Sequence, residues 1–257
     1  MLVLHGLEGC IRSHYASGLM ALLEQQGYRP VFMHFRGCSG HVNRLPRAYH
    51  SGDTGDLAAV IDHLGRVSGQ TVYAAVGFSL GGNVLLKWLA ETGSDNPLSR
   101  AIAISVPFNL ADATQRLEQG FSRLYRNYLL RKLHATYLRK QAANNLPIHV
   151  DVSQLTSFRN YDNLVTAPLH GFADASDYYK KSSCRQFLKD IKTPTQIIHS
   201  LDDPFMFPHS VPTRAELSDS IEFLLCEAGG HLGFVCGRLP WRSRYWHEQK
   251  IGEFLAR

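Results

Sequence analysis

Residues 76–82 read Val-Gly-Phe-Ser-Leu-Gly-Gly and lie between a strand-like apolar run and a helical pattern. The run Thr71–Val76 is typical of a buried strand, and Gly81–Leu89 carries apolar residues at helical spacing. A Gly-x-Ser-x-Gly sequence in this context places the serine on a tight turn, because the two glycines remove side chains that would clash there. We therefore expect Ser79 to be a nucleophile that projects from the carboxyl end of a strand. The alternative is a glycine-rich turn with an idle serine.

Apolar runs alternate with helical patterns on both sides of this turn. Short, continuously apolar strands that alternate with helices are typical of a parallel sheet covered on both faces. We therefore predict an α/β fold with a mostly parallel, doubly wound sheet, in which ligands bind at the carboxyl ends of the strands. The further expected strands are Met1–His5, Val31–Phe35, Ala101–Val106, Thr195–His199 and Ile221–Cys226. The further expected helices are Tyr15–Gln25, one capped by Asp53 or Thr54, and Tyr245–Leu255.

The alternation stops between residues 108 and 191, where helical patterns occur without strands. We predict a core of residues 1–107 and 192–257, with a helical cap, residues 108–191, that covers the strand ends and shapes a pocket. Basic residues gather between Arg116 and Lys140, together with apolar residues at helical spacing. These apolar residues are Phe121, Leu124, Tyr125, Tyr128 and Leu129. We favour a cap helix with a solvated basic side over a face that touches anionic lipid.

Composition narrows the class of protein. The 257 residues contain 27 Lys and Arg against 22 Asp and Glu, and this mild basic excess comes with no nucleic-acid recognition motif. Five widely spaced cysteines without C-x-x-C argue against a disulfide framework and favour a reducing cytoplasm. The 13 histidines show no metal-binding spacing, so we expect neither a metal nor a cofactor. The chain opens on the short apolar run MLVL without a basic region, so we expect no signal peptide. No apolar run reaches the roughly 18 residues that span a bilayer.

Acidic residues and a histidine follow the later expected strands. Asp202 and Asp203 come after Thr195–His199, and His231 follows Ile221–Cys226 on a glycine-flanked loop. Serine, acid and histidine in this chain order are typical of a hydrolase in which the histidine activates the serine and the acid orients the histidine. We assign the acid to Asp203, with Asp202 as the alternative, and the other aspartate then holds the turn.

The first expected strand ends in the turn His5-Gly6-Leu7-Glu8-Gly9. We expect the backbone N–H groups of Leu7 and Leu80 to form an oxyanion hole and His5 to orient the loop. The stretch His170–Tyr179 is expected near the mouth of the site, where its aspartates Asp174 and Asp177 have a structural role.

Several longer motifs carry a family resemblance that extends over essentially the whole chain. They are HGLEG (5–9), MHFRGCSG (33–40), YHSGDTGD (49–56), GFSLGGN (77–83), HGFADASDYY (170–179), HSLDDPFM (199–206) and GGHLGF (229–234). The chain resembles the YheT-like α/β-hydrolase family, the AB hydrolase 4 group.

The resemblance implies a carboxylesterase or lipid-ester hydrolase that acts on small-molecule esters, with Ser79 as nucleophile, Asp203 as orienting acid and His231 as base. A thioesterase or acyltransferase that uses the same residues, or an inactive fragment that only binds a partner, are the alternatives. Members of the family carry further strands before the H-G-x-x-G strand. We therefore expect the six strands here to be strands three to eight of an eight-stranded design, whose first strands are missing.

Overall fold

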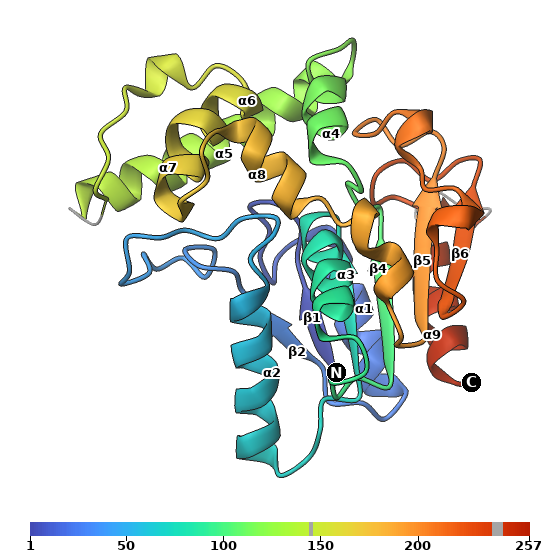
Figure 1. Ribbon diagram of the computed structural model, residues 1–257. Helices are drawn as coiled ribbons and strands as arrows, with labels where there is room; N and C mark the ends of the chain where they lie inside the picture. Colours follow the sequence, from blue (N-terminus) through green and yellow to red (C-terminus); the bar gives the residue numbers. More distant parts are fainter. Residues whose placement is uncertain (144–145, 238–243) are drawn as a thin grey trace.

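The apolar runs form a parallel sheet at the centre of the molecule (Figure 1). The computed structural model describes residues 1–143, 146–237 and 244–257. Neighbouring strands of the six-stranded sheet follow the order β2-β1-β3-β4-β5-β6, and every pair is parallel. The predicted parallel α/β sheet is therefore confirmed. Its strands are β1 (Leu2–Leu4), β2 (Val31–Met33), β3 (Ala74–Phe78), β4 (Arg100–Ile104), β5 (Thr195–Ser200) and β6 (Ile221–Cys226).

Helices cover both faces of this sheet, because alternate strand residues point to opposite sides. Helices α1 (His14–Gln25) and α9 (Trp246–Leu255) share a core cluster with Val3 and Val76. Helices α2 (Thr54–Ser68) and α3 (Leu80–Thr92) share the opposite cluster with Leu2, Leu4 and Ala75. A two-stranded antiparallel ribbon of β7 (Val235–Cys236) and β8 (Arg244–Tyr245) precedes α9.

The segment between β4 and β5 contains helices and, among its described residues, no strand. Figure 1 shows these helices, drawn in green to orange, beyond the carboxyl ends of the central strands. The α-helices are α4 (Leu110–Leu117), α5 (Ser122–Ala142), α6 (Phe158–Tyr161), α7 (Ala167–His170) and α8 (Ala175–Ser182). The shorter turns are the 3-10 helices η1 (Val152–Gln154) and η3 (Arg185–Asp190) and the π-helical turn η2 (Asp162–Thr166). Two more 3-10 helices, η4 (Pro208–Ser210) and η5 (Arg214–Glu216), follow β5.

Helix α5 buries a different face from the one that its apolar pattern suggests. Gly120, with φ +51°, separates α4 from α5, so the pattern that begins at Arg116 is not one continuous helix. The buried apolar side chains of α5 are Leu130, Leu133 and Tyr137. Side chains around its first turns are exposed instead, namely Phe121, Leu124, Tyr125 and Tyr128.

Several strand boundaries differ from those that the sequence predicts, and β3 and β2 show the physical reason. Strand β3 begins at Ala74 rather than Thr71 and continues to Phe78, because Phe78 still pairs with Ile104 of β4. Strand β2 ends at Met33 rather than Phe35, since the N–H of Phe35 donates to His5 Nε2 instead of to a neighbouring strand.

Candidate active site

Ser79 occupies a strained turn between β3 and α3. Its φ of +50° and ψ of −117° are rare for a residue with a side chain, and its N–H donates to the Ile104 carbonyl at 2.8 Å. A Cβ on Gly77 would lie 2.5 Å from the Gly81 carbonyl oxygen. A Cβ on Gly81 would lie 2.6 Å from the carbonyl oxygen of His5. The sequence prediction of a tight turn that tolerates only glycine at both flanking positions agrees with this geometry.

His231 and Asp203 meet Ser79 from two other strand ends. Ser79 Oγ lies 2.9 Å from His231 Nε2, and His231 Nδ1 lies 2.8 Å from Asp203 Oδ2. Asp203 is 3% exposed, and its Oδ1 also accepts the N–H of Phe205 at 2.8 Å. The ring of Phe205 stacks on the imidazole of His231 with centroids 3.9 Å apart. Ser79, Asp203 and Phe205 each contact the imidazole, and together these contacts fix its orientation.

Asp202, the neighbouring acid, has a separate task. Its Oδ1 accepts the N–H groups of Gly229 and Gly230 at 2.9 and 2.8 Å, so it holds the loop that carries His231. Burial opposes the ionisation of Asp202, but these hydrogen bonds outweigh burial and lower its pKa. Of the two adjacent aspartates, the structure brings Asp203 to the imidazole.

The loop after β1 leaves one backbone donor unused. The N–H of Gly6 donates to the Tyr15 hydroxyl, that of Glu8 to the Tyr49 hydroxyl, and that of Gly9 to the Gly6 carbonyl. Leu7 is the residue of this turn whose N–H has no acceptor among the described residues.

Two further features bear on the expected oxyanion hole. Leu80 is the first residue of α3, and the N–H groups of a first helical turn have no acceptor within the helix. His5 is fully buried below the loop, where burial lowers its pKa to about 4 and its Nε2 accepts from Phe35. His5 therefore has the contacts of a loop-orienting residue.

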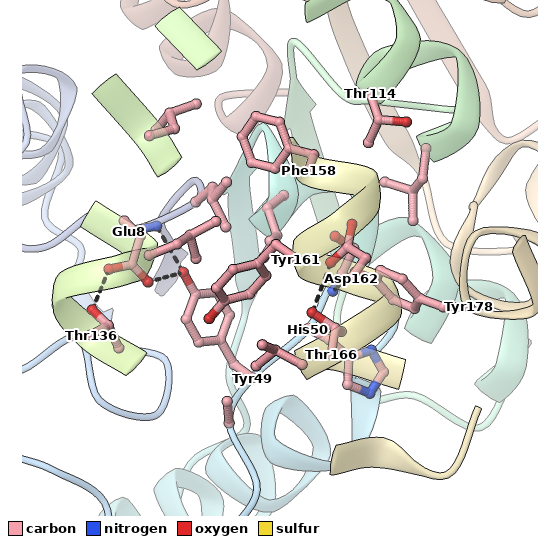
Figure 2. Close-up of a pocket in the computed structure, with 18 of the residues that line it drawn as sticks. Glu8, Tyr49, His50, Thr114, Thr136, Phe158, Tyr161, Asp162, Thr166 and Tyr178 are labelled. Carbon is pink, nitrogen blue, oxygen red and sulfur yellow. Dashed lines mark hydrogen bonds between the residues drawn. The ribbon is translucent and has the colours of Figure 1, made fainter. Parts of the chain in front are cut away.

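A cavity opens beside Ser79 under the helices between β4 and β5 (Figure 2). Its empty space, counted with its mouth, is about 1230 Å³. Most of its wall is hydrocarbon, which suits an apolar group bound next to the serine. The apolar lining includes Leu110, Leu117, Leu129, Leu133, Phe158 and Val165.

Acidic side chains for which the sequence motifs indicate no role also face this cavity. Asp162 accepts hydrogen bonds from the Thr166 and Tyr179 hydroxyls, each at 2.7 Å, and burial raises its pKa to about 6. Figure 2 shows its carboxyl group among the lining residues. The Asp-x-x-x-Thr spacing in a helical segment is the sequence signal that indicates the first of these bonds. Glu8 lines the cavity on another side.

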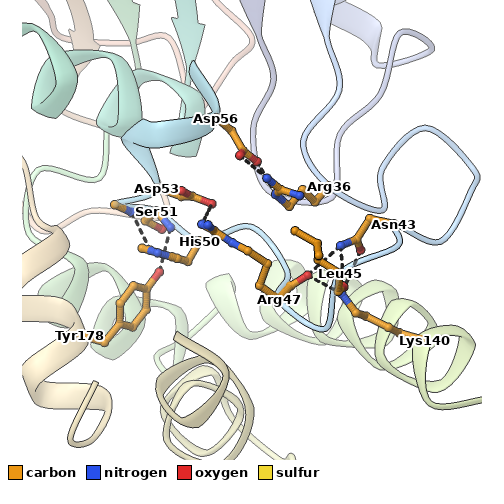
Figure 3. A network of polar contacts seen from close by, with 11 residues as sticks. Arg36, Asn43, Leu45, Arg47, His50, Ser51, Asp53, Asp56, Lys140 and Tyr178 are labelled. Carbon is orange, nitrogen blue, oxygen red and sulfur yellow. Dashed lines mark hydrogen bonds and ion pairs between the residues drawn. The ribbon is translucent and has the colours of Figure 1, made fainter. Parts of the chain in front are cut away.

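A polar network ties the loop after β2 to its surroundings (Figure 3). Arg36 pairs with Asp56 at 2.5 Å, and Arg47 pairs with Asp53 at 2.7 Å. Asp53 is the residue before α2, but its side chain pairs with Arg47 and makes no capping bond, which differs from the expected cap.

Lys140 of α5 joins the same network. It is 4% exposed, and its Nζ donates to Asn43 Oδ1 at 2.9 Å and to the Arg47 carbonyl. Burial lowers its pKa to about 8. The lysine therefore connects α5 to the loop that contains Asn43 and Arg47.

The stretch His170–Tyr179 lies at the cavity, as expected. His170, Tyr178 and Tyr179 line it. Asp174 accepts the N–H of Asp177 at 2.8 Å at the start of α8, and Asp177 accepts the N–H of Ala173 at 3.1 Å. Both aspartates therefore make the local contacts of structural residues.

Two features are absent from residues 1–143, 146–237 and 244–257. These residues contain no group of three or more His, Cys, Asp or Glu side chains that could hold a metal ion. They also contain no helix that is both long and apolar enough to cross a membrane. The thiols of all five cysteines, which lie within these ranges, are free.

Fold and family comparison together define the class of this protein. The family model described as the alpha/beta hydrolase fold matches residues 1–237. The chain therefore belongs to the α/β-hydrolase family, and the predicted fold class is confirmed. Proteins named as an esterase and as a lipase are among its relatives.

Particular relatives sharpen this class. The chain is 44% identical over its full length to the Escherichia coli (strain K12) protein named "Putative esterase YheT", of which it covers 76%, so the predicted YheT-like membership is confirmed. It is 32% identical, over 95% of its length, to human phospholipase ABHD3, of which it covers 61%. The solved structure of the Pyrococcus furiosus esterase Pf2001 matches with a TM-score of 0.61 at 18% identity, covering 99% of this chain and 81% of that one.

Proposed function

We propose that this protein is a serine esterase that cleaves carboxylic esters through an acyl-enzyme. The observation that carries the proposal is the continuous contact from Asp203 through His231 to the Ser79 hydroxyl, with 2.8 and 2.9 Å between the bonded atoms. A serine hydroxyl is a weak nucleophile until a neighbouring base takes its proton, and this arrangement supplies the base and the group that orients it.

The reaction then follows from the positions of these atoms. Ser79 Oγ attacks the ester carbonyl carbon while His231 Nε2 accepts the hydroxyl proton. The N–H groups of Leu7 and Leu80 stabilise the negative oxygen of the tetrahedral intermediate. His231 returns the proton to the leaving alcohol, which frees it and leaves Ser79 acylated. A water molecule, deprotonated by the same imidazole, then attacks the acyl carbon. The bond from this carbon to Ser79 Oγ breaks, Oγ takes the proton back from His231, and the carboxylic acid leaves. This cycle requires no metal or organic cofactor.

The cavity supports a hydrocarbon acyl group as the ligand beside Ser79. Its wall is mostly apolar, and the helices between β4 and β5 supply much of it. This arrangement supports the proposal that residues 108–191 form a cap. We therefore propose esters of short or medium acyl chains, or lipid-like esters, as substrates. The relatives named phospholipase and monoacylglycerol lipase support the lipid-like choice. The free thiols support the reducing cytoplasm as its location.

Exposed apolar side chains support a transient contact with a lipid surface. Phe121 is 71% exposed and Leu124 58% exposed, and Arg123 lies between them in the sequence. The neighbouring Tyr125 contacts Phe205, which stacks on His231, so this surface is continuous with the site. Apolar side chains next to basic ones suit an interface that carries anionic headgroups.

Labelling with a fluorophosphonate tests the proposed nucleophile. The reagent should modify the purified protein at Ser79 and leave a folded Ser79→Ala variant unmodified. A panel of 4-nitrophenyl esters of increasing acyl length should then be hydrolysed only by the protein with Ser79, and matched thioesters separate an esterase from a thioesterase. Folded protein that neither reacts with the reagent nor hydrolyses any of these esters would show the proposal to be wrong.

A further inference from the structure

Glu8 has an unusual place in the turn that contributes the Leu7 N–H. It is a non-glycine residue with φ +52°, a conformation that a side chain disfavours, and it directly follows Leu7. Its carboxyl group faces the cavity, yet the proposed reaction gives it no task. Something other than local preference must therefore hold this residue in place.

The first set of contacts comes from Tyr49, in the loop before α2. Its hydroxyl accepts the backbone N–H of Glu8 at 2.8 Å and donates to Glu8 Oε1 at 2.9 Å (Figure 2). One hydroxyl thus binds both the main chain and the side chain of the same residue. This pair of bonds fixes the side-chain direction relative to the peptide that follows Leu7.

The second set comes from α5. The Thr136 hydroxyl donates to Glu8 Oε2 at 2.7 Å, and Lys132 Nζ donates to the Glu8 carbonyl at 3.3 Å. Thr136 and Lys132 lie one helical turn apart, so one face of α5 holds both ends of Glu8. Both carboxyl oxygens accept hydrogen bonds, which is the role of an ionised carboxylate.

We propose that Glu8 is a positioning residue that fixes the Leu7 N–H for the oxyanion by tying the turn to Tyr49 and to Thr136 of α5. This inference rests on the proposed function, because it needs the Leu7 N–H to act in the reaction. The surroundings of Glu8 agree with it. Burial raises the pKa of the Glu8 carboxyl. Lys132 and Arg139 place positive charge near it, which favours the carboxylate and offsets the repulsion that a lone negative charge would exert on an oxyanion nearby.

If the contacts of Glu8 are removed, the enzyme should lose stabilisation of the transition state and keep its affinity for the ground-state ester. A ground-state ester does not need its carbonyl oxygen held tightly, whereas the oxyanion does, so a misplaced N–H lowers kcat more than it raises KM. The proposed role of Glu8 also makes oxyanion binding by the loop after β1 depend on α5, although Glu8 and Thr136 are 128 positions apart in the chain.

Removal of the Thr136 hydroxyl is the test. Thr136→Val keeps the shape of the side chain and removes the bond to Glu8, and Thr136→Ser restores a hydroxyl. Thr156→Val is the matched control, because the exposed Thr156 hydroxyl bonds to Asn160 outside the cavity. We would measure kcat and KM for 4-nitrophenyl butyrate per site titrated with a fluorophosphonate, together with inhibition by an alkyl trifluoromethyl ketone, which forms an oxyanion on the serine.

Thr136→Val is expected to lower kcat by tenfold to about a hundredfold, with KM changed less than about threefold. The affinity for the ketone should fall in the same proportion, and Thr136→Ser should recover most of both. An unchanged kcat per titrated site in Thr136→Val would overturn the proposal, as would a rise in KM with no loss of ketone affinity. A wild-type protein that fails to react with the fluorophosphonate would instead overturn the proposed function, and this inference with it.

Discussion

At the scale of single residues, the site depends on Ser79 in a backbone conformation that its neighbours impose. The ladder bond from its N–H to Ile104 and the absence of side chains at Gly77 and Gly81 leave the hydroxyl little freedom. His231 can therefore meet it at hydrogen-bond distance without a rearrangement of the main chain. This explains why a five-residue pattern is informative about both fold and site.

The two adjacent aspartates give a sharp prediction. In Asp203→Asn, an amide replaces the carboxylate that accepts from His231 Nδ1, so the imidazole loses its orienting charge, and kcat should fall by roughly 10³- to 10⁴-fold. In Asp202→Asn, the amide oxygen can still accept the N–H groups of Gly229 and Gly230, so the loss should stay within about tenfold. Steady-state hydrolysis of 4-nitrophenyl butyrate by both variants measures the difference. Equal losses would contradict the assignment.

The proximity of Ser79, Asp203 and His231 could be predicted because each follows a recognisable strand. The remaining residues of the site could not. The bonds from Glu8 to Thr136 and from Lys140 to Arg47 join positions 128 and 93 residues apart, and such contacts leave no periodic pattern in the sequence. Two adjacent carboxylates after a strand look alike in a sequence, so the sequence favours Asp203 and leaves Asp202 as the alternative. The contacts of Asp202 with Gly229 and Gly230 distinguish the two residues.

At the scale of elements, strands were easier to predict than their ends. Buried strands are continuously apolar, but a boundary depends on the partner that each N–H finds, as Phe35 shows by donating to His5. Helix α5 shows a similar effect. Its apolar residues repeat along the sequence, yet tertiary packing buries Leu133 and Tyr137 and leaves Phe121 and Leu124 exposed.

The exposed start of α5 can be tested as a lipid contact. The double variant Phe121→Ser, Leu124→Ser removes two apolar side chains, so association with vesicles of anionic phosphatidylglycerol should weaken by tenfold or more. Hydrolysis of soluble 4-nitrophenyl acetate should stay within twofold, because neither residue lines the cavity. Co-sedimentation gives the vesicle affinity, and Val67→Ser on α2, where Val67 is 65% exposed, is the control. Wild-type protein that stays in the supernatant at low salt would contradict this contact.

At the scale of the whole molecule, histidines stand out among the buried side chains. His5, His199 and His247 are each fully buried, and burial lowers the pKa of each to about 4. Neither ring nitrogen of His199 or His247 has a hydrogen-bond partner among the described residues. The fold therefore keeps these imidazoles neutral, while the unfolded chain protonates them near pH 6.5.

The difference in histidine pKa between the folded and the unfolded state fixes how the free energy of unfolding changes with pH. Above about pH 6.5 these histidines are neutral in both the folded and the unfolded state, so protonation does not lower the free energy of unfolding. As the pH falls from about 6.5 toward 4, the unfolded state takes up protons that the folded state refuses, so the free energy of unfolding falls by up to about 1.4 kcal/mol per pH unit for each histidine. Asp162, whose pKa burial raises to about 6, acts in the opposite direction and offsets one of the three.

Urea unfolding at pH 7.5, 6.0 and 5.0 should therefore show a midpoint that moves to lower urea as the solution is acidified. The variant His247→Leu removes one titrating group from an apolar site beside Phe78 and Phe234, so its free energy of unfolding should fall less steeply with pH than that of the wild type. The comparison of slopes matters more than that of absolute stabilities, because leucine also changes the packing. A wild-type midpoint that stays constant or rises between pH 7.5 and 5.0 would contradict this prediction.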